Sequence, residues 1–300
     1  MGGGVRSQKN QASISVIIPV WNDAKRLIHC LVSLRRQNFP QHQTEVIVVD
    51  NGSTDGSQEV ALSVPGVILL NEPKCGSYAA RNRGLEQATG EYVAFIDSDC
   101  EAAASWLESA IEMAQQNPGF GIIAGRIDLR IEHTRTDSAP VLYERLFAFN
   151  QKANATYGLC VTANWFSPKE VLTRFGGFDE RLRSGADTKL AAQIAAAGYR
   201  IIYGDSAVVY HPPRKSVAAL CSKRRRLIGG RWAACPGGRL KLALWLNICK
   251  GFMGEARYVG RIKGLGAGDK LKTLGVILML WAVSLSELLR LLRGATPRRS

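Results

Sequence analysis

Three short apolar runs, each ending in a polar loop, constrain the fold of this chain most. They cover residues 15–22, 45–53 and 91–99, and they stop at Asn or Asp. Between them lie a stretch with Leu27, Leu31 and Leu34 at helical spacing and a second helical stretch at 77–88. Strands that alternate with helices in this way predict βαβ units on a parallel sheet covered by helices on both faces. Ligands bind such sheets at the carboxyl ends of the strands.

Acidic side chains stand at two of these strand ends. Asp50 ends the second run, and Asp97 and Asp99 flank a serine at the end of the third. Paired carboxylates can hold a hard divalent cation such as Mg2+ or Mn2+, which often bridges protein carboxylates to substrate phosphates. Asp is also common at strand ends because it forms turns, so a purely structural role remains open for each residue.

Five motifs in order resemble family 2 glycosyltransferases with the GT-A fold. They are Ser-Val-Ile-Ile-Pro-Val-Trp-Asn (15–22), Val-Val-Asp-Asn-Gly-Ser-Thr-Asp-Gly-Ser (48–57), Ala-Arg-Asn-Arg-Gly (80–84), Gly-Glu-Tyr-Val-Ala-Phe-Ile-Asp-Ser-Asp (90–99) and Gly-Gly-Phe-Asp-Glu (176–180). The resemblance implies an α/β domain with a Rossmann-like, mostly parallel sheet over 13–215, divided into a nucleotide-binding half (13–100) and an acceptor half (101–215). It also implies inverting transfer from a nucleotide sugar, with a UDP-sugar as the first candidate, and dependence on Mg2+ or Mn2+.

The resemblance assigns a donor-side role to several residues. Asp50 resembles the carboxylate that binds the base, Asp97 the one that faces the ribose, and Asp99 the metal ligand of the DxD motif. The others are Pro19 and Asn22 in the opposite wall of the base pocket, Arg81 at the diphosphate, and Asn164 near the donor sugar. Simpler roles remain open, because Asp50 could cap its own loop and Arg81 could lie on a solvated helix face.

Two further residues complete the expected site. His211 ends a late apolar strand and resembles a histidine that contacts the metal or the diphosphate in several GT-A enzymes, although a surface His before a proline turn fits equally well. In the acceptor-side segment 176–190, the family's usual Glu-Asp pair appears as Ala186-Asp187. The second acid, Asp187, resembles the general base. It could also stabilise the start of a helix at 188–197, and both roles are compatible.

Other patterns predict structure rather than chemistry. Ser167-Pro168-Lys169-Glu170 has the spacing of a capping box with Pro in the first helical position, which predicts the start of a short helix. The apolar residues around Trp106 predict a core helix that ends at Asn117-Pro118-Gly119. Seven scattered cysteines without close pairs favour a reduced, cytoplasmic environment over a zinc site or a disulfide framework.

Charge separates the C-terminal region from the rest of the chain. Residues 1–210 contain 20 Lys and Arg against 22 Asp and Glu, whereas residues 211–300 contain 19 against 3. In the region 216–300 a basic run at 223–226 precedes apolar stretches at 240–252 and 273–286, and the latter is short of the roughly 20 residues that span a bilayer. Apolar faces with Trp beside Lys and Arg predict helices that lie on an anionic membrane, with a tilted span as a lesser alternative.

These observations favour one function over three competitors. We expect a glycosyltransferase at the cytoplasmic face of the membrane, peripheral or monotopic, acting on a lipid-linked or glycan acceptor, with residues 1–12 as a flexible leader. Nucleic-acid binding is disfavoured because the basic residues alternate with long apolar runs and no nucleic-acid-binding module is visible. A sugar nucleotidyltransferase would need a Gly-rich, basic loop near the first strand, and 19–22 has none. A non-catalytic membrane adaptor would not need Asp97, Asp99 and Asp187.

Overall fold

The computed structural model describes residues 13–131, 137–233 and 237–297, so the predicted leader at 1–12 lies outside the described part. The chain divides into two compact units. The first, here called the α/β unit, comprises Met1–Ile127, Gln151–Phe178 and Leu190–Tyr210. The second, the helical unit, comprises Asp128–Asn150, Asp179–Lys189 and His211–Ser300. The chain therefore passes between the units several times before its C-terminal region.

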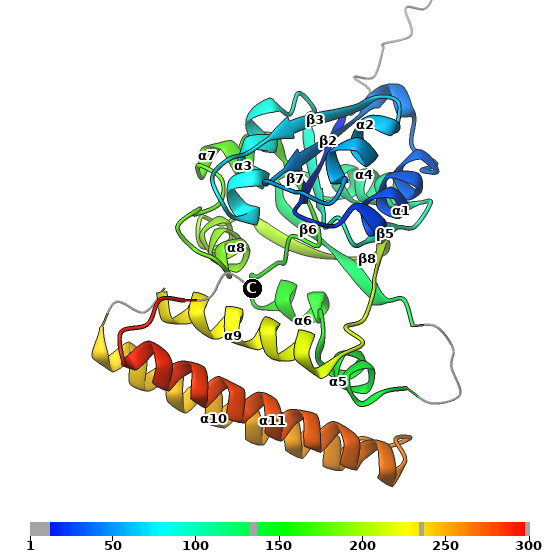
Figure 1. Ribbon diagram of the computed structural model, residues 1–300. Coiled ribbons are helices and arrows are strands. Elements are labelled where there is room, and N and C mark those ends of the chain that lie inside the picture. The colour runs from blue at the N-terminus through cyan, green and yellow to red at the C-terminus, as the bar shows by residue number, and fades with distance from the viewer. Residues whose placement is uncertain (1–12, 132–136, 234–236, 298–300) are drawn as a thin grey trace, which may run out of the picture. The chain divides into compact units, whose positions relative to one another are not determined.

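One sheet of eight strands forms the centre of the α/β unit, in the order β3-β2-β1-β4-β7-β6-β8-β5 (Figure 1). Its strands are β1 (Ile14–Val20), β2 (Thr44–Asp50), β3 (Val67–Asn71), β4 (Tyr92–Ile96), β5 (Glu101–Ala102), β6 (Phe120–Leu129), β7 (Asn164–Pro168) and β8 (Arg200–His211). The three strands expected in the first hundred residues are β1, β2 and β4, and the expected late strand that ends at His211 is β8. The short β3 was not expected.

The strand directions change at β4. Strand β1 lies parallel between β2 and β4, so that Ile17 is in register with both Ile47 and Phe95. On its other side β4 pairs antiparallel with β7, which places Ile96 opposite Asn164. Parallel pairing thus extends over β3-β2-β1-β4, as expected, while β7 pairs antiparallel with both of its neighbours. The carboxyl ends of β1, β2 and β4 lie along one edge of the sheet.

Helices cover the sheet because its side chains alternate between two apolar faces. One face packs against α1 (Ala24–Arg35), α2 (Ser57–Ser63) and α4 (Trp106–Gln116), and this core includes Val16, Ile18 and Val48. On the other face lies α3 (Ser77–Gln87). A Cβ atom at Gly84 of α3 would lie 2.5 Å from Cγ2 of Ile17. Glycine at this position therefore permits close packing of α3 on the sheet.

The capping box expected at Ser167 is not formed. Ser167 and Pro168 are the last residues of β7, and the short helix α7 (Lys169–Arg174) starts one residue later than expected, with Pro168 as its N-cap. The Ser167 hydroxyl donates to the carbonyl oxygen of Gly121 on β6 instead. The prediction of a short helix is confirmed, but its capping mechanism was wrong because a buried strand residue satisfies its hydroxyl across the sheet.

Most of the helical unit consists of long helices that pack side by side (Figure 1). They are α5 (Ala139–Phe147), α9 (Val217–Ala233), α10 (Gly238–Arg261) and α11 (Ala267–Leu292). Helix α11 contacts α5, α9 and α10. One apolar cluster joins Tyr143, Leu220 and Ile277, and a second joins Ile228, Ile248 and Leu288. Two further helices, α6 (Gln151–Thr156) and α8 (Ala186–Ala196), follow residues that belong to this unit.

Helix α11 is long and apolar enough to cross a membrane by length and composition, and within the described residues it is the one helix that meets both criteria. Part of its surface is nevertheless committed to the protein. Thr273, Ile277 and Leu280 are buried, and so is Glu287, whose carboxylate accepts hydrogen bonds from Arg290. The helix therefore has an inner face that packs on its neighbours and an outer face that is free for another contact.

Candidate active site

Hydrogen bonds join the loops that follow β1 and β2. Asn22 has a positive φ of 51°, and its Oδ1 accepts from the backbone N of Thr54 at 2.8 Å. The backbone N of Asn22 donates to Oγ of Ser53 at 2.9 Å. Pro19 lies in β1 in register with Val49 of β2. Pro19 and Asn22 are thus brought beside the second strand end as expected, and the Asn22 side chain links the two loops.

Asp50 ends β2 as a buried residue with a local hydrogen-bond network. Its carboxylate accepts from the backbone N of Gly52 at 3.3 Å, from that of Ser53 at 3.2 Å and from Nε2 of Gln58 at 2.8 Å. This is the loop-capping arrangement that the sequence left open as an alternative. A contact between Asp50 and a nucleotide base stays a prediction.

Asp97 follows β4 and forms an ion pair with Arg81 of α3. The Arg81 side chain is 5% exposed, and the Asp97 side chain is 33% exposed. Arg81 also donates to the carbonyl oxygen of Ser77 at 3.3 Å and lies over the ring of Tyr78, 5.7 Å from its centroid. A buried guanidinium is therefore held at the acidic loop, which differs from the solvated helix face considered as an alternative.

Asp99 belongs to a network that sequence reasoning missed. Arg26 of α1 places Nε 2.6 Å from Oδ1 of Asp23 and a terminal nitrogen 3.5 Å from Oδ2 of Asp99. The Ser98 hydroxyl donates to Oδ2 of Asp23 at 2.9 Å. Burial raises the pKa of Asp23, although the hydrogen bonds from Arg26 and Ser98 act in the opposite direction. The position of Asp23, directly after the first polar strand end, was the available signal.

The acidic loop fits a hard divalent cation. Asp97 and Asp99 offer carboxylate oxygens, which Mg2+ and Mn2+ prefer. Burial, reinforced by the charge of Asp99, raises the pKa of the neighbouring Cys100 thiol well above the ordinary value. Its Sγ donates to Oδ1 of Asp99 at 3.6 Å. The two carboxylates of this loop thus suit an oxygen-seeking metal.

Asn164 is 1% exposed and has its amide group occupied inside the α/β unit. Its Oδ1 accepts from Nε1 of Trp106 at 2.9 Å, and its Nδ2 donates to the carbonyl oxygens of Arg126 and Ala207 at 2.8 Å. These contacts join α4, β6, β7 and β8. They describe a structural role, and the expected proximity of Asn164 to the donor sugar stays a prediction.

Asp187 lies in the first turn of α8, in a segment that belongs to the helical unit. Its Oδ1 accepts from the backbone N of Thr188 at 2.9 Å, so it does stabilise the start of the helix. The same segment packs tightly on α9, because a Cβ atom at Gly230 would lie 2.7 Å from Cβ of Ser184. A role of Asp187 as general base is compatible with this position and stays a prediction.

His211 is the last residue of β8 and is 3% exposed. Its Nδ1 lies 2.7 Å from the carbonyl oxygen of Pro212, and its ring packs on Phe149 with 4.5 Å between the centroids. Because a carbonyl oxygen can only accept a hydrogen bond, this contact places a proton on Nδ1 and leaves Nε2 as the ring nitrogen that could face a metal. The residue is buried rather than at the surface, and metal binding by His211 stays a prediction.

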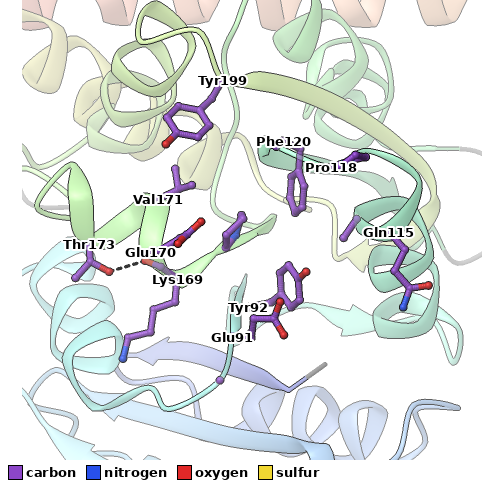
Figure 2. A pocket seen from close by; sticks show the side chains of 14 residues that line it. Glu91, Tyr92, Gln115, Pro118, Phe120, Lys169, Glu170, Val171, Thr173 and Tyr199 are labelled. Atoms are coloured by element: carbon purple, nitrogen blue, oxygen red, sulfur yellow. Dashed lines mark hydrogen bonds between the residues drawn. The ribbon is translucent and has the colours of Figure 1, made fainter. Parts of the chain in front are cut away.

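A cavity of about 700 Å³ lies at the opposite edge of the sheet, around the first residue of β4 and the last of β7 (Figure 2). Its lining includes Glu91, Tyr92, Phe120, Lys169 and Glu170. No predicted site residue belongs to it, since Asp97 and Asp99 follow the other end of β4. This cavity is therefore separate from the loops that carry the acidic residues.

Comparison with known proteins places the chain in a family. The Glycosyl transferase family 2 model matches residues 15–172. The chain is 31% identical to the glycosyltransferase AglE of Haloferax volcanii over 247 residues. This aligned region covers 78% of this chain and 80% of AglE. It is 30% identical over 216 residues to the pre-mycofactocin glycosyltransferase of Mycobacterium tuberculosis, which covers 69% of this chain and 44% of that protein.

Solved structures show the same fold. The mannosyltransferase PcManGT from Pyrobaculum calidifontis, in complex with GDP-Man and Mn2+, matches with a TM-score of 0.62 at 22% identity over 95% of this chain and 88% of its own. Residues 1–349 of S. aureus TarS, in complex with UDP-GlcNAc, match with a TM-score of 0.56 at 18% identity over 95% of this chain and 93% of theirs. The chain therefore belongs to glycosyl transferase family 2 and is a glycosyltransferase with the GT-A fold.

Proposed function

We propose that this protein is an inverting, divalent-metal-dependent glycosyltransferase that moves a sugar from a nucleotide sugar to a hydroxyl of a lipid-linked or otherwise membrane-presented acceptor. The observation that carries the proposal is the loop Asp97-Ser98-Asp99 at the carboxyl end of β4, on the same sheet edge as the linked loops after β1 and β2. Carboxylates at this edge suit a cation that neutralises phosphate.

On the donor side, the chain's own residues bind and orient the nucleotide sugar. Asp50 and the loop containing Pro19 and Asn22 hold the base, and Asp97 faces the ribose. Arg81 remains beside Asp97 as a fixed positive charge near the diphosphate, a position for which guanidinium is well suited. PcManGT with GDP-Man and TarS with UDP-GlcNAc support a sugar attached to a nucleoside diphosphate. A UDP-sugar is our first candidate.

Asp99 would hold the divalent cation, Mg2+ or Mn2+. Such a cation stabilises the negative charge that develops on the departing diphosphate. The complex of PcManGT with Mn2+ supports this assignment. His211, whose Nδ1 contacts the carbonyl oxygen of Pro212, is a further candidate ligand through Nε2.

Asp187 would accept the proton of the acceptor hydroxyl as that oxygen attacks the anomeric carbon from the face opposite the leaving group. Its segment packs on α9 within the helical unit. The unit that carries the proposed base is therefore also the one that carries the basic, apolar C-terminal helices. This shared support favours an acceptor presented by a membrane.

The outer faces of α10 and α11 support a peripheral position at the cytoplasmic leaflet. On α10 the exposed Leu242, Trp245, Leu246 and Met253 recur at helical spacing, and α11 exposes a further set, Leu271, Leu278, Met279, Leu289 and Leu292. Lysines and arginines lie between these side chains along both helices. Exposed apolar stripes beside basic residues suit insertion into the interface of an anionic membrane.

The metal-dependent step is tested with Asp99→Ala. Donor hydrolysis or transfer should be screened across UDP- and GDP-sugars with Mn2+ and with Mg2+. The variant should lose metal-dependent turnover by at least about 100-fold, the scale of losing a preorganised electrostatic contact to the leaving group. Its circular dichroism should remain native, because Asp99 is a loop residue. Full turnover in this variant would remove Asp99 from the mechanism.

The membrane assignment is tested by sedimentation with lipid vesicles. The full chain should pellet with anionic vesicles, and high salt should weaken but not abolish binding, because screening acts on charges and spares buried Trp and Leu. Trp245→Glu combined with Leu246→Glu should release the protein, whereas Leu62→Glu, at an exposed leucine of the α/β unit, should not. Salt-insensitive binding to neutral vesicles would favour a membrane-spanning α11 instead.

A further inference from the structure

Arg26 contacts two carboxylates that come from different strand ends. Its Nε lies 2.6 Å from Oδ1 of Asp23, which follows β1, and a terminal nitrogen lies 3.5 Å from Oδ2 of Asp99, which follows β4. All three residues belong to the α/β unit. The guanidinium group thus links the first turn of α1 to the acidic loop that the proposed function assigns to the metal.

The two contacts of Arg26 differ in strength. The Asp23 contact is a short, charge-assisted hydrogen bond, whereas the Asp99 contact is a longer ion pair at 3.5 Å. The Arg26 side chain is 54% exposed, so water can replace the weaker contact at little cost. The end of the side chain near Asp99 is therefore the part that can move.

Asp23 provides a fixed anchor for Arg26. Its backbone N donates to Oγ of Ser57 at 3.1 Å, and its backbone oxygen accepts from N of Leu27 at 3.0 Å at the start of α1. Its other carboxylate oxygen accepts from the Ser98 hydroxyl, inside the acidic loop itself. Asp23 therefore fixes the loop and keeps Arg26 within reach of Asp99, whether or not the ion pair is formed.

We propose that Arg26 is an exchangeable counter-charge for Asp99, which competes with the divalent cation for this carboxylate and thereby sets the metal concentration that the enzyme requires. Arg26 keeps its bond to Asp23 and withdraws its terminal nitrogens when the cation binds Asp99. It is a positioning residue, since it acts through Asp99. The inference rests on the proposed role of Asp99 as metal ligand, and it adds a regulator of that site.

The competition predicts the sign of a substitution. In Arg26→Gln the competing charge and its repulsion of a dication disappear together, so both effects should tighten metal binding. We expect the dissociation constant for Mn2+ to fall about two- to fivefold, which matches the weak coupling typical of exposed ion pairs. A residue that merely oriented Asp99 for the metal would give the opposite sign.

The experiment measures Mn2+ binding to the full chain by electron paramagnetic resonance of the free ion, with and without UDP. Arg83→Gln is the matched control, because Arg83 is 43% exposed and pairs with Glu86 at 3.4 Å on α3. Arg26→Gln should bind Mn2+ more tightly than the native chain, and Arg83→Gln should bind it equally. Arg26→Lys, which keeps the charge but lacks the second set of nitrogens, should fall between native and Arg26→Gln.

Unchanged or weaker Mn2+ binding in Arg26→Gln, with native circular dichroism, would overturn the exchange. Asp99→Asn separates this failure from a failure of the proposed function. If Asp99→Asn binds Mn2+ as the native chain does, Asp99 is not the ligand and both proposals fall. If Asp99→Asn loses Mn2+ while Arg26→Gln binds it no more tightly, the metal site stands and the competition does not exist.

Discussion

The two carboxylates of the acidic loop each pair with an arginine, but in one pair the arginine is the more buried partner and in the other pair the acid is. At Asp97 the arginine is 5% exposed and the acid 33% exposed, whereas at Asp99 the arginine is 54% exposed and the acid 18% exposed. In the first pair burial holds the Arg81 guanidinium in place, and in the second pair the more buried partner is the carboxylate of Asp99. The buried Arg81 has lost its water and cannot leave without a large cost, while Arg26 remains hydrated. The comparison teaches that an ion pair next to a ligand site can be a permanent or a replaceable one.

The largest expected effect concerns Asp187, an acid that belongs to neither pair. If Asp187 is the general base, Asp187→Asn should lower the transfer rate by about 100-fold or more and leave donor and metal binding unchanged. Asn supports helix starts well, so the fold should persist. Single-turnover kinetics with the acceptor would measure the effect. Asp269→Asn, at another first-turn acid of the helical unit, is the control, and an Asp187→Asn variant with the native rate would leave the reaction without an assigned base.

The comparison itself predicts unequal effects on stability. Arg81→Met should lower the free energy of unfolding by about 2 kcal/mol, less than for a fully buried pair because Asp97 is partly hydrated. Arg26→Met should cost about 1 kcal/mol, because the Asp99 contact is solvated and the main loss is the hydrogen bond to Asp23. Urea unfolding of both variants gives the two values side by side. Equal losses would show that burial of the arginine does not distinguish the pairs.

Glu144 in the helical unit sharpens the comparison, because here the acid is buried and both of its cationic partners are about three-quarters buried. It is 1% exposed and accepts from Arg214 at 3.0 Å and from Lys223 at 3.1 Å. Burial alone would raise the pKa of Glu144, but Lys223 and Arg214 outweigh it and the pKa is lowered. A lowered pKa means that the stabilisation is complete at neutral pH and declines as the pH falls below the ordinary carboxyl value.

The pH dependence should therefore differ between the native chain and Glu144→Gln. Thermal unfolding should be measured from neutral pH down to about pH 4. The unsubstituted protein should lose stability more steeply than Glu144→Gln, because only the unsubstituted protein has a carboxylate at position 144 that takes up a proton on unfolding. The variant should be less stable at neutral pH. Parallel slopes would mean that Glu144 has the same proton affinity in the folded and unfolded chain.

The sequence predicted the parts of the fold that follow from local periodicity. Strands β1, β2 and β4 and helices α1 and α3 were visible as apolar runs and helical spacings, and the positions of Asp97 and Asp99 followed from them. The short β3 was not visible, because its residues are only partly buried and lie between a turn and a polar stretch. The compact helical unit was also only partly visible, since residues 128–150 and 179–189 join it from distant parts of the sequence.

Long-range partners account for what was missed in the site. Arg26 was not singled out from the sequence, because its contact with Asp99 links residues more than seventy positions apart. The resemblance suggested a place near the donor sugar for Asn164, but it gave no sign of the three partners from other elements that its amide contacts. Local pattern reveals which residues stand at a strand end. It does not reveal which charges and amides the folded chain has already paired.

The packing of Asn164 limits how this enzyme can change over generations. A Cβ atom at Gly125 would lie 2.3 Å from the amide of Asn164, so a side chain at one position requires a different residue at the other. Substitutions at these two positions are coupled, because either substitution alone destabilises the core. Gly125 and Asn164 should therefore change together or not at all, and the junction of α4, β6, β7 and β8 that they form should stay the same.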